Sequence, residues 1–154
     1  GYWALGALNP DIIAFIGCDM VYDAKPGQMT HFYGCGAADP LRADVTLQSL
    51  EAKSLRLQAL AQQNGCAVVN LSERKKSRLC FPRLAFTTLA TMTQRPDVEP
   101  PSPCAVELAL NAESDLGYWV ESGRYWEEQD RFDRQKLRDI DDLWLATATE
   151  LALA

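Results

Sequence analysis

Two side chains near the start of this sequence are of types that perform acid–base or ligand-binding chemistry. Asp19 and Gly17 follow an apolar run, and His31, the only histidine, lies in the polar loop that comes next. An imidazole with a pKa of about 6.5 accepts a proton near neutral pH, so His31 is a candidate general base. A carboxylate at a strand end is held rigidly, so Asp19 is a candidate catalytic residue that binds a ribose, a metal ion or an acceptor hydroxyl.

The only concentrated run of positive charge in the chain lies between Ser72 and Arg78. Cationic side chains, hydroxyl groups and backbone N–H groups all bind phosphate oxygens. We therefore interpret this segment as a phosphate-binding loop. The predicted ligand-binding residues are Gly17, Tyr22, Asn70, Ser72, Arg74, Lys75, Lys76, Ser77 and Arg78.

Each candidate also has a structural interpretation. Asp19 can cap its own loop, and a single histidine is often structural. A charged run usually belongs to a solvated loop. Cys18, His31 and Cys35 form a partial zinc set, but the chain has no CxxC pair and a structural zinc site uses four closely spaced ligands, so we predict no metal. The sequence also lacks a GxxxxGK[ST] phosphate loop and a GxSxG hydrolase motif.

The elements that position these residues form a predicted βαβ unit. The apolar run 12–16 is typical of a strand buried on both faces in a parallel sheet. Asp44 is a suitable N-cap for a helix over 45–64, which Asn64 and Gly65 end, and 66–71 is a second strand. Because the carboxyl ends of parallel strands share one edge, we expect Ser72 to lie near Asp19.

The C-terminal part differs in composition. Residues 79–92 are predicted as a strand or a short helix, and 94–103, with four prolines, as a linker. A helix begins near 105, and a long amphipathic helix is predicted from Arg124 onward. Its apolar positions are Trp126, Phe132, Leu137, Ile140, Trp144, Ala148 and Leu151. The predicted domains are thus 1–93, the linker 94–103, and a helical extension over 104–154.

The predicted fold class is α/β, a small parallel sheet forming a Rossmann-like half with a helical C-terminal extension. The 154 residues carry a net charge of -6, which disfavours nucleic-acid and anionic-membrane binding. No apolar run approaches the roughly 18 to 20 residues that span a bilayer. The five irregularly spaced cysteines indicate reduced thiols and a cytoplasmic location. Because the chain begins with Gly1, we expect a partial reading frame in which earlier strands are missing.

A family resemblance is carried by GCDMVY at a strand end, His31 in a polar loop, a helix containing SLEAKSLRLQALAQQNG, and the strand CAVVNLS followed by a serine-containing loop. This order resembles the C-terminal half of the nucleotide-binding domain of bacterial lipooligosaccharide sialyltransferases. It is also similar to pterin-diphosphokinase-like Rossmann proteins. The resemblance covers about 75 residues and is fold-level analogy.

The resemblance implies a CMP-sugar donor, no required metal, and a histidine base. Gly17, Asp19 and Tyr22 match the family's G-x-D-x-x-Y motif, and His31 matches the base. Asn70 and Ser72 fall where the family has its polar segment after the strand. The chain departs from the pattern at Phe32, where the family has a serine, in its shorter loop, and in lacking the preceding strands.

Two function hypotheses from different classes follow. The first is a glycosyltransferase-like or nucleotide-sugar/phosphate-binding domain, whose only cofactor-like ligand is a sugar nucleotide substrate. The second is a non-catalytic, truncated Rossmann-like module that forms homo-oligomers through the helices carrying Trp119, Trp126 and Trp144. A phosphate-binding enzyme outside sugar transfer shares the cationic loop with the first hypothesis and differs in its ligand.

Overall fold

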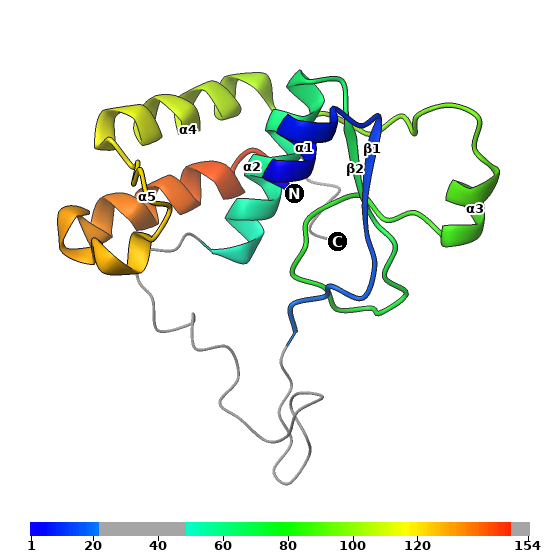
Figure 1. Cartoon of the computed structure of the whole chain (residues 1–154), viewed down its shortest axis with the longest axis horizontal. Helices are drawn as coiled ribbons and strands as arrows, with labels where there is room; N and C mark the ends of the chain where they lie inside the picture. The colour runs from blue at the N-terminus through cyan, green and yellow to red at the C-terminus, as the bar shows by residue number, and fades with distance from the viewer. Residues whose placement is uncertain (22–48, 149–154) are drawn as a thin grey trace, which may run out of the picture.

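The computed structural model describes residues 1–21 and 49–148 (Figure 1). Candidates Tyr22 and His31, together with Cys35 and the expected N-cap Asp44, lie outside the described residues. The helices are α1 (Tyr2–Leu8), α2 (Leu50–Gln63), α3 (Phe86–Thr91), α4 (Pro103–Leu116) and α5 (Arg134–Leu145), and the strands are β1 (Ile12–Phe15) and β2 (Ala67–Asn70). Two short 3-10 turns, Tyr125–Glu127 and Gln129–Arg131, precede α5.

The two described strands form the predicted parallel pair. Ile12 lies opposite Ala67, and Phe15 lies opposite Asn70. The expectation that β1 is buried on both faces is wrong, because Ile16, directly after it, is 69% exposed and Ala14 is exposed. One face, with Ile13 and Phe15, packs into a core cluster that also contains Leu57, Ala61, Val68 and Phe81. The fold is therefore a small α/β arrangement in which α2 covers one face of the sheet.

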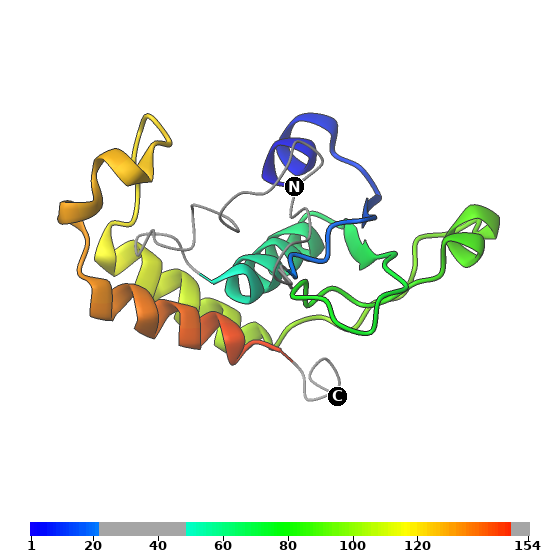
Figure 2. The same ribbon diagram turned by 90° about the horizontal axis from the view of Figure 1, so that it is seen from below.

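Helix α2 joins the two halves of the described structure. Ser49 caps it by accepting a 3.0 Å hydrogen bond from the Ala52 N–H, so the described helix begins at Leu50 and not at the expected 45. Leu57 and Ala61 pack toward the sheet. Ala52 and Ala59 pack into a second cluster with Val106 and Ala109 of α4 and Ile140 and Trp144 of α5. Figures 1 and 2 show α4 and α5 side by side next to α2.

The prediction of one long helix from Arg124 is wrong in its extent. Asp133 accepts hydrogen bonds from the Gln135 and Lys136 N–H groups, at 2.7 and 3.1 Å, and so begins α5 at Arg134. Before this cap, Phe132 packs against Tyr118 and Tyr125 in an aromatic cluster of its own. None of the described helices is long and apolar enough to cross a membrane.

The proline-rich segment between α3 and α4 packs along α2. The Gln62 Nε2 group donates a 3.1 Å hydrogen bond to the Val98 carbonyl, and the Arg95 guanidinium donates to the Gly65 carbonyl. Pro96 and Pro101 are buried. Helix α3, by contrast, has no buried residue and stands at the end of an arm in both ribbon views. The linker thus brings α4 back onto the helix that also covers the sheet.

Candidate functional site

The parallel pairing places Asp19 beside the cationic loop at the carboxyl edge of β1 and β2. Gly17 has a φ of 67°, a left-handed conformation that glycine adopts without strain, and it turns the chain after β1. The Asp19 carbonyl accepts a 2.9 Å hydrogen bond from the Arg78 N–H. The Asp19 Oδ2 atom lies 3.6 Å from Arg74 Nε. Backbone and side chain therefore both connect this aspartate to the loop.

The Asp19 carboxylate is largely buried, with 9% of the residue exposed. Its Oδ1 atom has no hydrogen-bond partner among the residues that the structure describes. A buried carboxylate oxygen that lacks a donor costs free energy, so a donor that reaches this oxygen gains a favourable hydrogen bond. An acceptor at this edge suits the hydroxyl of a ligand.

Asn70, at the end of β2, fixes the shape of the loop from inside. It is 2% exposed, its Nδ2 donates to Ser77 Oγ at 3.0 Å, and its Oδ1 accepts from the Ser72 N–H at 2.9 Å. Ser72 Oγ in turn accepts from the Arg74 N–H, and Ser77 Oγ from the Leu79 N–H. Both serine hydroxyls therefore hold the backbone of the loop.

Arg83 binds the loop from the outside and was missed by the sequence analysis. Its Nη1 donates to the carbonyls of Ser72 at 2.8 Å and Arg74 at 2.6 Å, and its Nη2 donates to the Lys75 carbonyl at 3.3 Å. Arg83 is exposed, and none of the described carboxylates forms an ion pair with it. No sequence motif marks this residue, because its role depends on the backbone bridge between Asn70 and Arg83.

The remaining cations of the loop differ in their surroundings. Arg78 makes a two-bond ion pair with Glu51 of α2, at 2.6 and 2.8 Å, which lowers the pKa of that carboxyl. Lys75 and Lys76 are exposed, and no described carboxylate pairs with either ammonium group. The charge of Arg78 is thus used within the fold, whereas those of Lys75 and Lys76 are available to a ligand.

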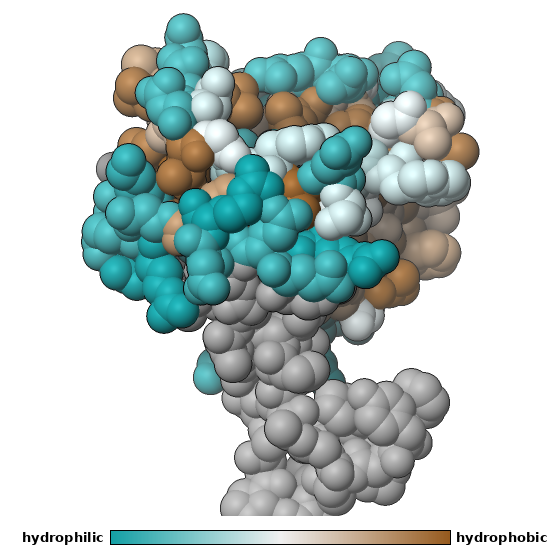
Figure 3. All heavy atoms as spheres, turned by 60° about the vertical axis from the view of Figure 1, so that its left-hand side comes forward, coloured by the Kyte–Doolittle hydropathy of each residue, from teal (hydrophilic) through white to brown (hydrophobic). Residues whose placement is uncertain are grey.

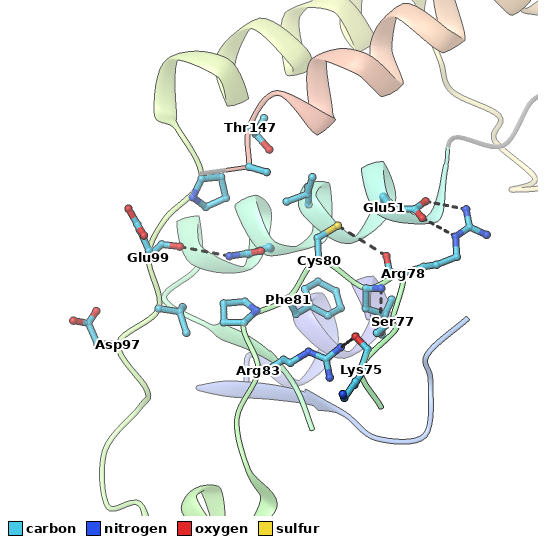
Figure 4. Close-up of a pocket in the computed structure, with 17 residues that line it drawn as sticks. Glu51, Lys75, Ser77, Arg78, Cys80, Phe81, Arg83, Asp97, Glu99 and Thr147 are labelled. Carbon is cyan, nitrogen blue, oxygen red and sulfur yellow. Dashed lines mark hydrogen bonds and ion pairs between the residues drawn. The ribbon is translucent and has the colours of Figure 1, made fainter. Parts of the chain in front are cut away.

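A cavity of about 630 Å³ adjoins the loop (Figure 4). It lies between α2, the segment Lys75 to Arg83, the linker, and the residues that follow α5. Of the candidate residues, Lys75, Ser77 and Arg78 line it, whereas Gly17, Asp19, Asn70, Ser72, Arg74 and Lys76 do not. Its volume is typical of small-molecule sites. The predicted residues therefore divide between the strand edge and this cavity.

In the described ranges, no three His, Cys, Asp or Glu side chains are grouped so that they could hold a metal ion. No family model matches the chain, and neither a curated protein nor a solved structure matches it at a significant level.

Proposed function

We propose that this chain binds a phosphate-bearing small molecule of the sugar-nucleotide class at the carboxyl edge of β1 and β2, as a glycosyltransferase-like domain with a Rossmann-like sheet. One observation carries the proposal: the cationic loop is held in one shape by Asn70 and Arg83 while its lysines remain exposed and unpaired with described carboxylates.

A preformed loop favours binding because less conformational entropy is lost when the ligand arrives. Lys75, Lys76 and Arg83 supply positive charge to phosphate oxygens. Hydrogen bonds between such charged groups are stronger than those between neutral groups. The chain as a whole is acidic and repels a phosphate dianion, whereas the positive charges of this segment attract one locally.

The catalytic part of the proposal assigns His31 the role of general base and Asp19 that of orienting the acceptor hydroxyl. His31 takes the hydroxyl proton as the oxygen attacks the sugar carbon, and the nucleotide phosphate leaves with the bonding electron pair. His31→Ala should therefore abolish sugar transfer and leave nucleotide binding unchanged. We also propose a cytoplasmic location, which the free thiols of the described cysteines support.

Thermal shift measurements test the binding. CMP, UMP and UDP-glucose are compared with cytidine and uridine, which lack phosphate. At ten times the dissociation constant, linkage gives about 1.4 kcal/mol of stabilisation, or a rise in Tm of about 3 to 6 °C. The rise should occur only with phosphate, weaken with added salt, and disappear in Lys75→Ala/Lys76→Ala.

The matched control is Lys136→Ala, which removes an exposed lysine from α5. It should respond to nucleotides as the unchanged protein does. A flat Tm with every nucleotide, or an equal rise in the double lysine variant, contradicts the proposal.

Self-association through the C-terminal helices is a second candidate function, which exposed apolar side chains favour. Trp119 is 70% exposed and Leu108 of α4 is 56% exposed, and apolar patches lie between hydrophilic side chains on the face shown in Figure 3. Trp144 cannot serve as an interface residue as expected, because it is fully buried in the core. Light scattering over a concentration series tests this function: a dimer that Trp119→Ser converts to a monomer supports it, and a monomer throughout contradicts it.

A further inference from the structure

The cavity beside the loop contains a buried amide oxygen that lacks a partner. Gln58 of α2 is 5% exposed, and its Nε2 group donates to the Glu99 carbonyl at 3.5 Å. That bond places the amide nitrogen toward the linker, and Oε1 has no hydrogen-bond donor among the described residues. Gln58 lines the cavity, and a hydroxyl group that reaches its covered Oε1 atom meets a desolvated acceptor with no competing donor among the described residues.

The walls around this amide are of three kinds. Leu55, Phe81, Val98 and Pro101 supply apolar surface, Asp97 and Glu99 place carboxylates at the linker end, and Lys75, Arg78 and Arg83 place cations on the side of the loop. Figure 4 shows Asp97 and Glu99 at one end of the cavity and Arg78 with Glu51 at the other, with Phe81 between them. Neither Asp97 nor Glu99 forms an ion pair with any described cation.

Hydroxyl groups are the donors that fit such a set of acceptors, and the C–H faces of a sugar ring fit apolar walls. A neutral heteroaromatic or aliphatic ligand leaves most of the acceptors unused, and the linker carboxylates repel an anionic group at their end of the cavity. That end of the lining therefore selects the uncharged part of a compact ligand with several O–H donors.

We propose that this cavity is a saccharide subsite, in which a sugar hydroxyl donates to Gln58 Oε1 and the ring packs against Leu55 and Phe81. Where the bound sugar is part of a sugar nucleotide, the inference rests on the proposed function. The subsite itself requires no phosphate, so neutral glycosides test it separately from the cationic loop.

The experiment is a titration of the full chain with the methyl glycosides of glucose, galactose and mannose, followed by nitrogen–proton NMR spectra. Saturable shifts should appear at the Gln58 side-chain amide and at the Val98 and Glu99 backbone amides for at least one sugar. Gln58→Leu keeps the side-chain volume and removes the acceptor, so the affinity should fall about five- to tenfold, the value of one neutral hydrogen bond. Gln63→Leu, an exposed position on the same helix, should bind as the unchanged protein does.

Two further variants make the result decisive. Val98→Phe fills the cavity from the linker, so it should abolish the shifts even where Gln58→Leu alters the fold. Lys76→Ala, at a residue of the loop that does not line the cavity, should weaken nucleotide binding and leave glycoside affinity unchanged, so that loss of phosphate binding and loss of sugar binding are separate results. The absence of saturable shifts with all three glycosides, or equal affinity in Gln58→Leu, overturns the proposal.

Discussion

The indole Nε1 of Trp144 donates a 2.7 Å hydrogen bond to the Oε1 atom of Glu113 inside the packed interface between α4 and α5. The same carboxylate accepts from Arg56 Nε of α2, at 2.8 and 3.0 Å. The Arg56 guanidinium also lies over the Tyr2 ring, 5.3 Å from its centroid. Glu113 thus connects α2, α4 and α5, and Arg56 extends the cluster to α1. This polar cluster holds the helical extension against the half of the fold that carries the loop.

Removing this acid should destabilise the protein strongly. Glu113→Ala leaves the Arg56 cation without its carboxylate and the Trp144 N–H without an acceptor, and we expect a loss of about 2 to 3 kcal/mol in the free energy of unfolding. Urea denaturation measures it. Glu107→Ala, at an exposed position of α4, should change stability by less than about 0.5 kcal/mol. Equal midpoints for the two variants contradict the importance of the cluster.

The sequence predicts the parallel pair well because two short apolar runs flank one amphipathic helix, and that order leaves few alternatives. It predicts the exposure of β1 poorly. The alternation that exposes Ala14 and Ile16 depends on α2 covering only one face, and an apolar run carries no information about which face is covered.

The sequence also misses Arg83 and Gln58, for a common reason. Arg83 acts through carbonyls of the loop, and Gln58 through the backbone of the linker, so neither role leaves a pattern of side-chain types. The overlong helix has another cause. Trp126 and Phe132 fit the helical spacing, but Asp133 caps the N-terminus of α5, so the helix begins only after both residues. The periodicity of apolar residues does not show where such a cap starts a helix.

The pH dependence of stability should reveal Asp141 of α5. Burial raises its pKa from 3.8 to about 6, even though the hydrogen bond from the Ser49 N–H and the charge of Lys53 lower it; Asp142 and Glu51 raise it further. The folded state therefore keeps a proton that the unfolded chain has lost. The contribution of Asp141 to stability is full below about pH 4, falls as the pH rises to about 6, and is constant above it.

Asp141→Asn isolates this effect, because the amide oxygen can still accept from Ser49 and carries no charge. The difference in Tm between the variant and the unchanged protein should grow in favour of the variant between about pH 4 and pH 6 and then level off. Asp139→Asn, at an exposed position of the same helix, should show no such growth. A Tm difference for Asp141→Asn that is the same at every pH is inconsistent with a raised pKa.

Asn70 should control the order of the cationic loop. Asn70→Leu removes the acceptor of the Ser72 N–H and the donor to Ser77 Oγ, so stability should fall by about 1 to 3 kcal/mol. Hydrogen exchange gives the more specific result, because the Ser72 amide should lose its protection. Asn111→Leu, on the exposed face of α4, is the control. A Ser72 amide that exchanges equally slowly in Asn70→Leu shows that the loop does not depend on this anchor.

The cysteines should react with alkylating reagents in the order of their exposure. Cys104 is exposed on α4, whereas Cys66 is 1% exposed and burial raises the pKa of its thiol, so less of the reactive thiolate forms. Burial also raises the pKa of the half-buried Cys80, which lines the cavity. Peptide mass spectrometry over a time course of iodoacetamide should therefore find Cys104 modified first, Cys80 later, and Cys66 only after unfolding in urea.

The same measurement links reactivity to the saccharide subsite. A bound methyl glycoside covers Cys80 and leaves Cys104 in solvent, so it should slow alkylation of Cys80 alone. The protection should disappear in Val98→Phe, in which the cavity is filled and Cys80 is shielded before any ligand is added. Protection of Cys104 to the same degree means that the glycoside acts on the reagent or on the whole fold, because a ligand in this cavity has no contact with α4 at that position.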